Sequence, residues 1–185
     1  MVNRWPDWDK KILNISGEKF SGKSHLANIF RLKSKAFLIK GDKIHNSIFK
    51  SLKLYESIII DDFESCKEEE ILYSIFNLID QDSKYLLINS LKPINEIKFN
   101  LPDLNSRVKN CIYVEIENPD DELLFAILLK NFSDRQIKIE KKIINFIISR
   151  IDRSYRKIDE FIYKIDELSL KKKKPINFKT IKEIL

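Results

Sequence analysis

A glycine-rich segment near the start of the chain carries the residues best suited to chemistry. The sequence has only three glycines, and two of them, Gly17 and Gly22, frame the motif G-x-x-x-x-G-K-[ST], which ends in Lys23 and Ser24. Glycines let the backbone of such a loop wrap a phosphate chain with its N–H groups. The lysine reaches the β- and γ-phosphates and the serine hydroxyl coordinates Mg²⁺. The motif therefore predicts a phosphate-binding loop for a nucleotide.

The predicted nucleotide site covers the whole loop and the residue after it. Its members are Gly17, Glu18, Lys19, Phe20, Ser21, Gly22, Lys23, Ser24 and His25. An apolar strand candidate (11–16) precedes the loop and a helical stripe (23–32) follows it, which is the order that a phosphate-binding loop requires. The alternative is a glycine turn that happens to precede Lys-Ser. We expect His25 to pack beneath the loop.

Two adjacent carboxylates end the most apolar strand candidate, Ser-Ile-Ile-Ile-Asp-Asp at residues 57–62. Such a run is typical of a central parallel strand buried on both faces. Ligands in these sheets lie at the carboxyl ends of the strands. Asp61 is therefore predicted to help Ser24 hold Mg²⁺, usually through water, and Asp62 to orient or deprotonate an attacking water. Two solvated aspartates at the start of a loop are the less favoured interpretation.

A parallel sheet is needed to bring these residues together. Strand candidates cover residues 11–16, 36–39, 57–62, 84–90 and 111–116, and helical segments cover 23–33, 42–52 and 67–82. This alternation predicts an α/β fold with a five-stranded parallel sheet and flanking helices. The strand at 84–90 ends in Asn89 and Ser90, where a neutral side chain could hydrogen-bond the γ-phosphate or the attacking water.

The chain changes character after residue 117. Residues 118–121 read Asn-Pro-Asp-Asp, a turn followed by a helix cap. Apolar stripes then predict helices over 121–131, 140–151 and 155–168, with a last short helix ending at Leu185. We predict a nucleotide-binding α/β domain over 1–117 and a small all-helical lid domain over 118–185.

Composition limits the remaining function classes. The 185 residues are 43% hydrophobic, which is enough for a core, and the net charge is +6. Four of these charges form the run 171–174, which is weak evidence for nucleic-acid binding and fits a solvated turn between helices equally well. The start of the chain has no signal core and no apolar run could cross a bilayer, so a cytoplasmic location is expected. Cys66 and Cys111 are too few for a disulfide framework or a zinc cluster and are expected to be reduced.

The order of these features resembles the AAA+ family of ATPases, and within it the bacterial replication-initiator group that contains DnaA and Hda. The resemblance covers nearly the whole chain. Residues 17–24 stand at the family's Walker A, 58–62 at Walker B, and 89–90 at sensor 1. Residues 101–107 (Leu-Pro-Asp-Leu-Asn-Ser-Arg) resemble the segment with the arginine finger, and 151–156 the start of the lid helix with sensor 2. The resemblance implies ATP or ADP with Mg²⁺ as cofactors.

The resemblance also implies roles for two arginines. Arg107 would be the finger that acts on a nucleotide in a neighbouring subunit. Arg156 would contact this chain's own nucleotide, with Arg153 as the second choice for that role. Together with Asp62 and Asn89 these arginines complete the predicted catalytic set. Without the resemblance, Arg107 is a surface arginine in a loop and Arg156 a solvated arginine on a helix.

Three short segments are similar to the alphaproteobacterial Hda branch: residues 5–8, 101–104 and 134–136. The helix-turn-helix domain of DnaA is missing, which favours a regulator over an origin-recognising initiator. The branch implies a negative regulator of chromosomal replication initiation, which stimulates hydrolysis of DnaA-bound ATP and is itself a weak ATPase. DnaA is then the expected partner, with self-association left open and DNA contact weak or indirect. Residues 1–10 lack the glutamine-containing clamp-binding peptide, so the sliding clamp is a doubtful partner.

Two alternatives remain open. One is a stand-alone P-loop NTPase, such as a small-molecule kinase, which would need an acceptor pocket in the lid. The other is a DnaA-like adaptor that binds nucleotide without hydrolysing it.

Overall fold

The computed structural model describes residues 1–172 and 178–184. The contacts within it divide the chain into two compact units. The first unit comprises residues 1–17 and 21–116, and the second comprises residues 18–20 and the chain from 117 onward. The division into a domain of residues 1–117 and a lid of 118–185 stays a prediction.

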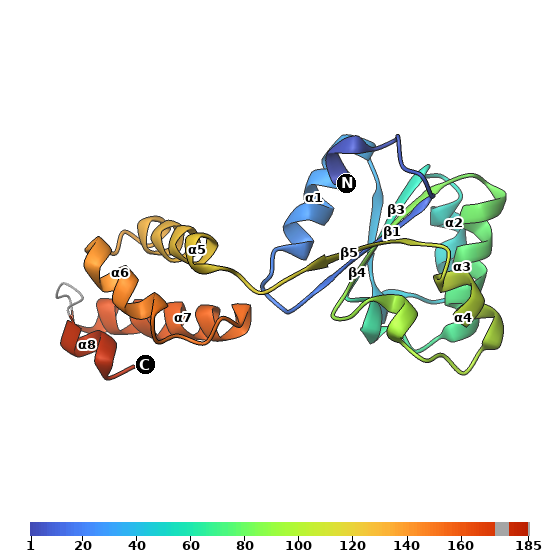
Figure 1. Cartoon of the computed structure of the whole chain (residues 1–185). Helices are drawn as coiled ribbons and strands as arrows, with labels where there is room; N and C mark the ends of the chain where they lie inside the picture. The colour runs from blue at the N-terminus through green and yellow to red at the C-terminus, as the bar shows by residue number, and fades with distance from the viewer. Residues whose placement is uncertain (173–177, 185) are drawn as a thin grey trace. The chain divides into compact units, whose positions relative to one another are not determined.

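The first unit is built on a five-stranded sheet with the strand order β2-β3-β4-β1-β5 (Figure 1). The strands are β1 (Ile12–Gly17), β2 (Phe37–Lys40), β3 (Ser57–Asp61), β4 (Tyr85–Ser90) and β5 (Ile112–Ile116). Every neighbouring pair is parallel, so the predicted α/β class with a parallel sheet is confirmed. Because the strands run in one direction, their carboxyl ends meet at the same edge of the sheet.

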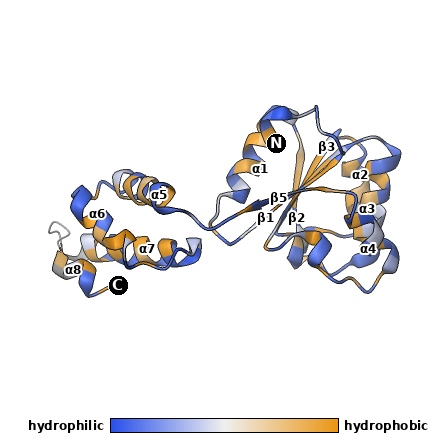
Figure 2. Ribbon diagram, viewed as in Figure 1, coloured by the Kyte–Doolittle hydropathy of each residue, from blue (hydrophilic) through white to orange (hydrophobic). Residues whose placement is uncertain are grey.

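Helices cover both faces of this sheet (Figure 1). One face is covered by α1 (Lys23–Ser34), and the other by α2 (Phe49–Leu52), α3 (Glu69–Gln81) and α4 (Pro102–Val108). The strands are coloured largely orange in Figure 2, as expected for strands buried on both faces. On the α3 side the core includes Phe76 and Ile79, both 0% exposed, and on the α1 side Phe30, also 0% exposed. Burying one such side chain contributes roughly 1.5–3 kcal/mol.

The N-terminal segment packs on the α1 side of the sheet. It contains a short 3₁₀ turn, η1 (Val2–Arg4), followed by two tryptophans. Trp8 stacks on Phe30 with ring centroids 5.2 Å apart, and Trp5 meets the edges of Phe30 and Tyr85 at 6.0 and 5.8 Å. Both tryptophans therefore extend the hydrophobic core of the first unit.

Two connections differ from the sequence prediction. The segment 42–52 is not one helix but two 3₁₀ turns, η2 (Gly41–Lys43) and η3 (Asn46–Ile48), followed by the four-residue α2. Its apolar residues at 44, 48 and 52 are buried, but His45 is extended with φ −154° and interrupts the helix. The helix α4 was not predicted, although Pro102 at its first position is a common helix start.

Gly41 allows a close approach between the connections that follow β2 and β3. A Cβ at Gly41 would lie 2.4 Å from the Asp62 carbonyl oxygen and 2.6 Å from Ser65 Oγ. The turn η2 therefore packs directly against η4 (Phe63–Ser65). A further 3₁₀ turn, η5 (Ile94–Glu96), follows β4. The position of the Asp62 backbone thus depends on a glycine outside the phosphate-binding motif.

The second unit has helices where the apolar stripes predicted them. They are α5 (Asp121–Asp134), α6 (Lys141–Ile148), α7 (Tyr155–Lys172) and α8 (Phe178–Lys182). Asp120 caps α5 by accepting a hydrogen bond from Leu123 N at 2.8 Å. The core of this unit includes Leu124, Leu128, Phe132, Ile144, Ile147 and Ile165. The predicted turn in the lysine run falls partly on residues 173–174, which lie outside the described residues, as does Leu185.

Both cysteines are free, as expected. Burial raises the pKa of the Cys111 thiol to about 12, so this thiol stays protonated at neutral pH. Within the described ranges, no helix combines the length and the apolar character needed to cross a membrane.

Candidate nucleotide-binding site

The phosphate-binding loop predicted from the sequence joins the end of β1 to the start of α1. Gly17, the last residue of β1, has a φ of 152°, and Gly22, which caps α1, has a φ of 93°. A Cβ on Gly17 would lie 3.0 Å from Ile116 O, whereas one on Gly22 would meet nothing. Gly17 is therefore needed for both close packing and its backbone conformation, and Gly22 for its conformation alone.

The side chains of the loop differ in burial and in their hydrogen bonds. Lys23 Nζ donates to Gly17 O at 2.7 Å, which places the ammonium beside the loop backbone. Ser21 Oγ is buried and has no hydrogen-bond partner among the described residues. His25 is exposed, so the prediction that it packs beneath the loop is wrong. It lies about 200° around α1 from the buried Ala27, which faces the sheet.

Three polar side chains from separate elements meet beside the loop. Ser24 Oγ, in the first turn of α1, lies 3.2 Å from Asp61 Oδ2 at the end of β3. Asn89 Nδ2, near the end of β4, donates to Asp61 Oδ1 at 2.9 Å. Asp61 is 9% exposed and Asn89 is 0% exposed. The sheet thus brings together the serine, the aspartate and the asparagine that the sequence placed at its carboxyl edge.

The cluster includes a buried hydrogen-bond acceptor that is not satisfied by the described residues. Asn89 Oδ1 is buried and has no hydrogen-bond partner within the described part of the chain. Nowhere in that part do three His, Cys, Asp or Glu side chains gather as a metal site. A cation here would rely on Ser24, Asp61, water and ligand oxygens, which suits Mg²⁺, because this ion usually takes one or two carboxylates and keeps several waters.

Asp62 is not part of this cluster. It has a left-handed backbone, with φ 51°, and caps the turn η4. Its side chain is 64% exposed, and its carboxylate lies 4.0 Å from Lys40 Nζ. The left-handed turn directs this carboxylate away from Asp61, although the two residues are adjacent in sequence.

The chain is similar in sequence to other proteins along most of its length, although no protein-family profile matches it. An uncharacterized protein of Haemophilus influenzae is 26% identical over 195 residues, which cover 97% of this chain and 83% of that protein. The chromosomal replication initiator protein DnaA of Lachnoclostridium phytofermentans is 25% identical over 96% of this chain. This chain spans only 38% of the length of that DnaA.

Several solved structures are similar to this chain in fold, although their sequence identity is low. Domain III of the Thermotoga maritima replication initiation protein DnaA has a TM-score of 0.78 and 19% identity, with 100% of this chain and 86% of that chain covered. The chain has the AAA+ fold of DnaA domain III. The RuvB branch migration motor of Thermotoga maritima follows with a TM-score of 0.71, 18% identity, and coverage of 95% and 60%. AMPPCP-bound DnaA of Aquifex aeolicus has a TM-score of 0.69, 20% identity, and coverage of 90% and 59%.

In this AAA+ fold, Arg107 lies on α4. Its side chain is 42% exposed, and its Nη1 forms an ion pair with Asp80 Oδ2 near the end of α3. The start of α4 is fixed by Glu69, whose carboxylate accepts hydrogen bonds from Asn100 N at 3.1 Å and Leu101 N at 2.7 Å. These hydrogen bonds lower the pKa of Glu69. No sequence pattern indicates Asp80 as the partner of Arg107.

Arg153 and Arg156 belong to the second unit. Arg156 Nε lies 3.6 Å from Glu160 Oε1, one turn further along α7, and its side chain is 58% exposed. Arg153 Nη2 lies 2.8 Å from Asp121 Oδ1 at the start of α5. The role of Arg156 at the nucleotide, with Arg153 as second choice, stays a prediction.

A buried asparagine that the sequence prediction missed supports the end of β4. Asn14, on β1, is 0% exposed. Its Nδ2 donates to Ile88 O at 3.1 Å and to Ser90 Oγ at 2.8 Å, and its Oδ1 accepts from Ile94 N at 3.0 Å. These bonds fix the chain on both sides of the point where β4 ends, next to Asn89. The signal in the sequence was one polar residue in the middle of an apolar strand.

Replacing Asn14 with alanine is expected to lower the free energy of unfolding by about 1–3 kcal/mol. The substitution removes the hydrogen bonds that Asn14 makes with Ile94 N and with Ile88 O. A buried polar group left without its hydrogen bond costs about 1–3 kcal/mol. Urea unfolding followed by circular dichroism measures the change. Asn28→Ala, at an exposed position on α1, is the matched control and should change the stability by less than about 0.5 kcal/mol. Equal stability of the two variants would contradict the role of the Asn14 network.

Proposed function

We propose that this chain binds ATP or ADP together with Mg²⁺ at the loop 17–24. One observation carries the proposal: Lys23, Ser24, Asp61 and Asn89 come from three separate elements and lie together where a parallel sheet binds ligands. The buried, unpartnered Ser21 Oγ and Asn89 Oδ1 support it, because a polar ligand or its water would satisfy both atoms. The Aquifex aeolicus DnaA with the same fold is described as AMPPCP-bound.

Each residue has a separate task in this proposal. The loop backbone and Lys23 bind the phosphates, and the N-terminus of α1 adds its positive dipole end. Ser24 and Asp61 hold the cation, which when bound neutralises charge on the phosphate oxygens. Asn89 orients the γ-phosphate or a water. Asp62 would need to turn from Lys40 toward the cluster before it could act on a water.

We propose further that the chain regulates replication initiation in the manner of Hda, with DnaA as partner. Arg107 stimulates the hydrolysis of ATP bound to a neighbouring DnaA, and the chain itself is a weak ATPase. Three observations support this step. The sequence is similar to DnaA over nearly the whole chain, Arg107 lies in a Leu-Pro-Asp-Leu-Asn-Ser-Arg segment, and its side chain is exposed enough to reach a second protein.

The test mixes the purified chain with ATP-loaded DnaA from the same organism and follows phosphate release. The proposal predicts that DnaA-bound ATP is hydrolysed faster than in either protein alone. An unchanged rate, with both proteins nucleotide-bound, would contradict the regulatory role while leaving nucleotide binding in place. Phosphate transfer to a metabolite, without any effect on DnaA, would favour the small-molecule kinase instead.

A further inference from the structure

We propose that Asp80 is a positioning residue that holds the guanidinium of Arg107 on its own chain until a nucleotide phosphate in the partner competes for it. This inference rests on the proposed function, because it assigns a control element to the arginine finger of that proposal. It starts from the ion pair between Asp80 Oδ2 and Arg107 Nη1. Among the described residues, Arg107 is the cation within ion-pair distance of Asp80.

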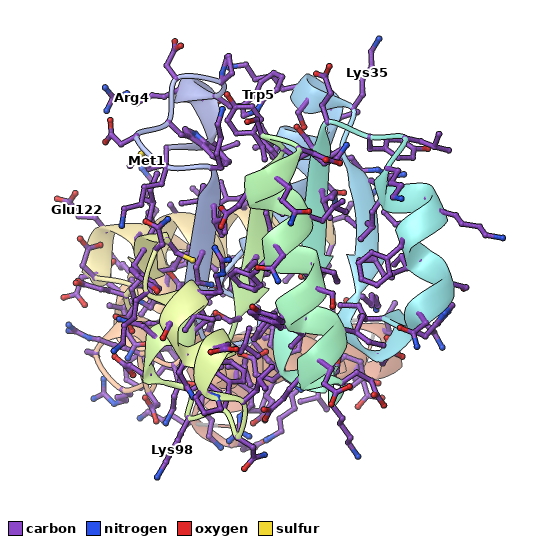
Figure 3. The ribbon with its side chains drawn as sticks, turned by 90° about the vertical axis from the view of Figure 1, so that its right-hand side faces the viewer. Met1, Arg4, Trp5, Lys35, Lys98 and Glu122 are labelled. Carbon is purple, nitrogen blue, oxygen red and sulfur yellow. The ribbon has the colours of Figure 1, made fainter. Side chains whose placement is uncertain are left out.

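The backbones on both sides of this ion pair are fixed. Asp80 follows the fully buried Ile79 on α3, and Arg107 lies between Leu104 and Val108, which are 0% and 1% exposed. Figure 3 views the first unit from the side covered by α3 and α4. Since the two helices cannot move without disrupting this core, the ion pair is made or broken by side-chain rotation alone. The side chains themselves are 37% and 42% exposed, so a partner can reach them.

The surrounding charges favour this pairing over others. Asp80 lies in the last turn of α3, where the negative end of the helix dipole disfavours a carboxylate unless a cation compensates. Asp82, two residues further on, lies 3.8 Å from Lys84 Nζ and is thus engaged elsewhere. Lys10, like Asp80, acts electrostatically on Cys111, but its Nζ donates to Cys111 O at 3.3 Å and is thus engaged there.

The strength of the pair suits a restraint that a phosphate can break. An ion pair this exposed changes an equilibrium by a factor of at most about five. A polyphosphate carries more charge than one carboxylate and accepts the guanidinium in a bidentate manner. In the unbound chain, Arg107 therefore stays paired with Asp80. When the partner's nucleotide comes within reach, its phosphate replaces Asp80 as the partner of Arg107.

Chemical modification tests the restraint without reference to DnaA. Phenylglyoxal reacts with accessible, unpaired guanidinium groups, and mass spectrometry of tryptic peptides gives the rate at each arginine. In Asp80→Ala the rate at Arg107 should rise about 2- to 5-fold, with the exposed Arg31 as internal reference. In the wild type the rate at Arg107 should rise with ionic strength, because salt screens exposed charges, whereas in Asp80→Ala it should not. Asp82→Asn removes an acid from the same turn and should leave Arg107 unchanged.

Stimulation of DnaA then tests the consequence. At concentrations below saturation, Asp80→Ala and the isosteric Asp80→Asn should stimulate hydrolysis of DnaA-bound ATP more than the wild type does, by up to about fivefold. Equal phenylglyoxal rates at Arg107 in the wild type and Asp80→Ala would overturn the restraint. Variants that stimulate no better than a stimulating wild type would overturn it as well. If neither the wild type nor the variants stimulate DnaA, the proposed function fails, and the modification rates still decide whether Asp80 holds Arg107.

Discussion

Lys23→Ala is expected to weaken the binding of ATP and ADP by about 30-fold or more. The ammonium lies 2.7 Å from Gly17 O, beside the backbone that is proposed to wrap the phosphates. Removing one partner of a hydrogen-bonded charge pair costs roughly 2–5 kcal/mol, and about 1.4 kcal/mol corresponds to a tenfold change in affinity. Titration with a fluorescent ATP analogue, with ATP as competitor, measures the loss.

The control for this variant is Arg31→Ala, which removes a positive charge from the exposed side of the same helix, α1. It should bind nucleotide like the wild type, because Arg31 lies two turns beyond the loop. Unchanged affinity in Lys23→Ala, with the fold intact by circular dichroism, would contradict the assignment of residues 17–24 as the phosphate-binding loop.

Arg107→Ala is expected to bind nucleotide normally but to lose stimulation of DnaA. An arginine finger stabilises the charge that develops on the transferring phosphate, and its removal costs about 10³–10⁵ in rate. Arg107→Lys keeps the charge but not the planar fork, so it should restore little of the activity. Release of phosphate from ATP-loaded DnaA, measured at a saturating concentration of each variant, gives the effect.

Lys109→Ala is the matched control, because Lys109 is exposed at the end of the same helix, α4. It removes one positive charge close to Arg107 and should leave the stimulated rate within about twofold of the wild type. Full stimulation by Arg107→Ala would show that Arg107 is not an arginine finger. The chain would then act on its partner through other residues.

The sheet and the strand, loop and helix around residues 17–24 could be predicted because their signals are local. An apolar β-branched run such as residues 58–60 has few alternatives to a buried strand, and Gly17 and Gly22 permit the positive φ angles that the loop adopts. The meeting of Ser24, Asp61 and Asn89 followed from the rule that parallel strands end at one edge. The strand order that makes β3 and β4 neighbours was not itself predicted.

The remaining features depend on contacts between segments distant in sequence. Asp62 follows Asp61 but lies apart from it, because a left-handed turn packed against Gly41 directs its carboxylate toward Lys40. The pair of Asp80 and Arg107 joins two helices, one of which was itself unpredicted. The local sequence of each helix does not predict such an ion pair, because the pair forms only when α3 and α4 pack side by side.

A crystal structure with a non-hydrolysable ATP analogue and Mn²⁺, which replaces Mg²⁺ and gives an anomalous signal, tests the central claim most directly. The account predicts phosphates within the backbone of residues 17–24 and an anomalous peak between Ser24 Oγ and the Asp61 carboxylate. Phosphates bound elsewhere, or a manganese peak remote from Ser24 and Asp61, would contradict it.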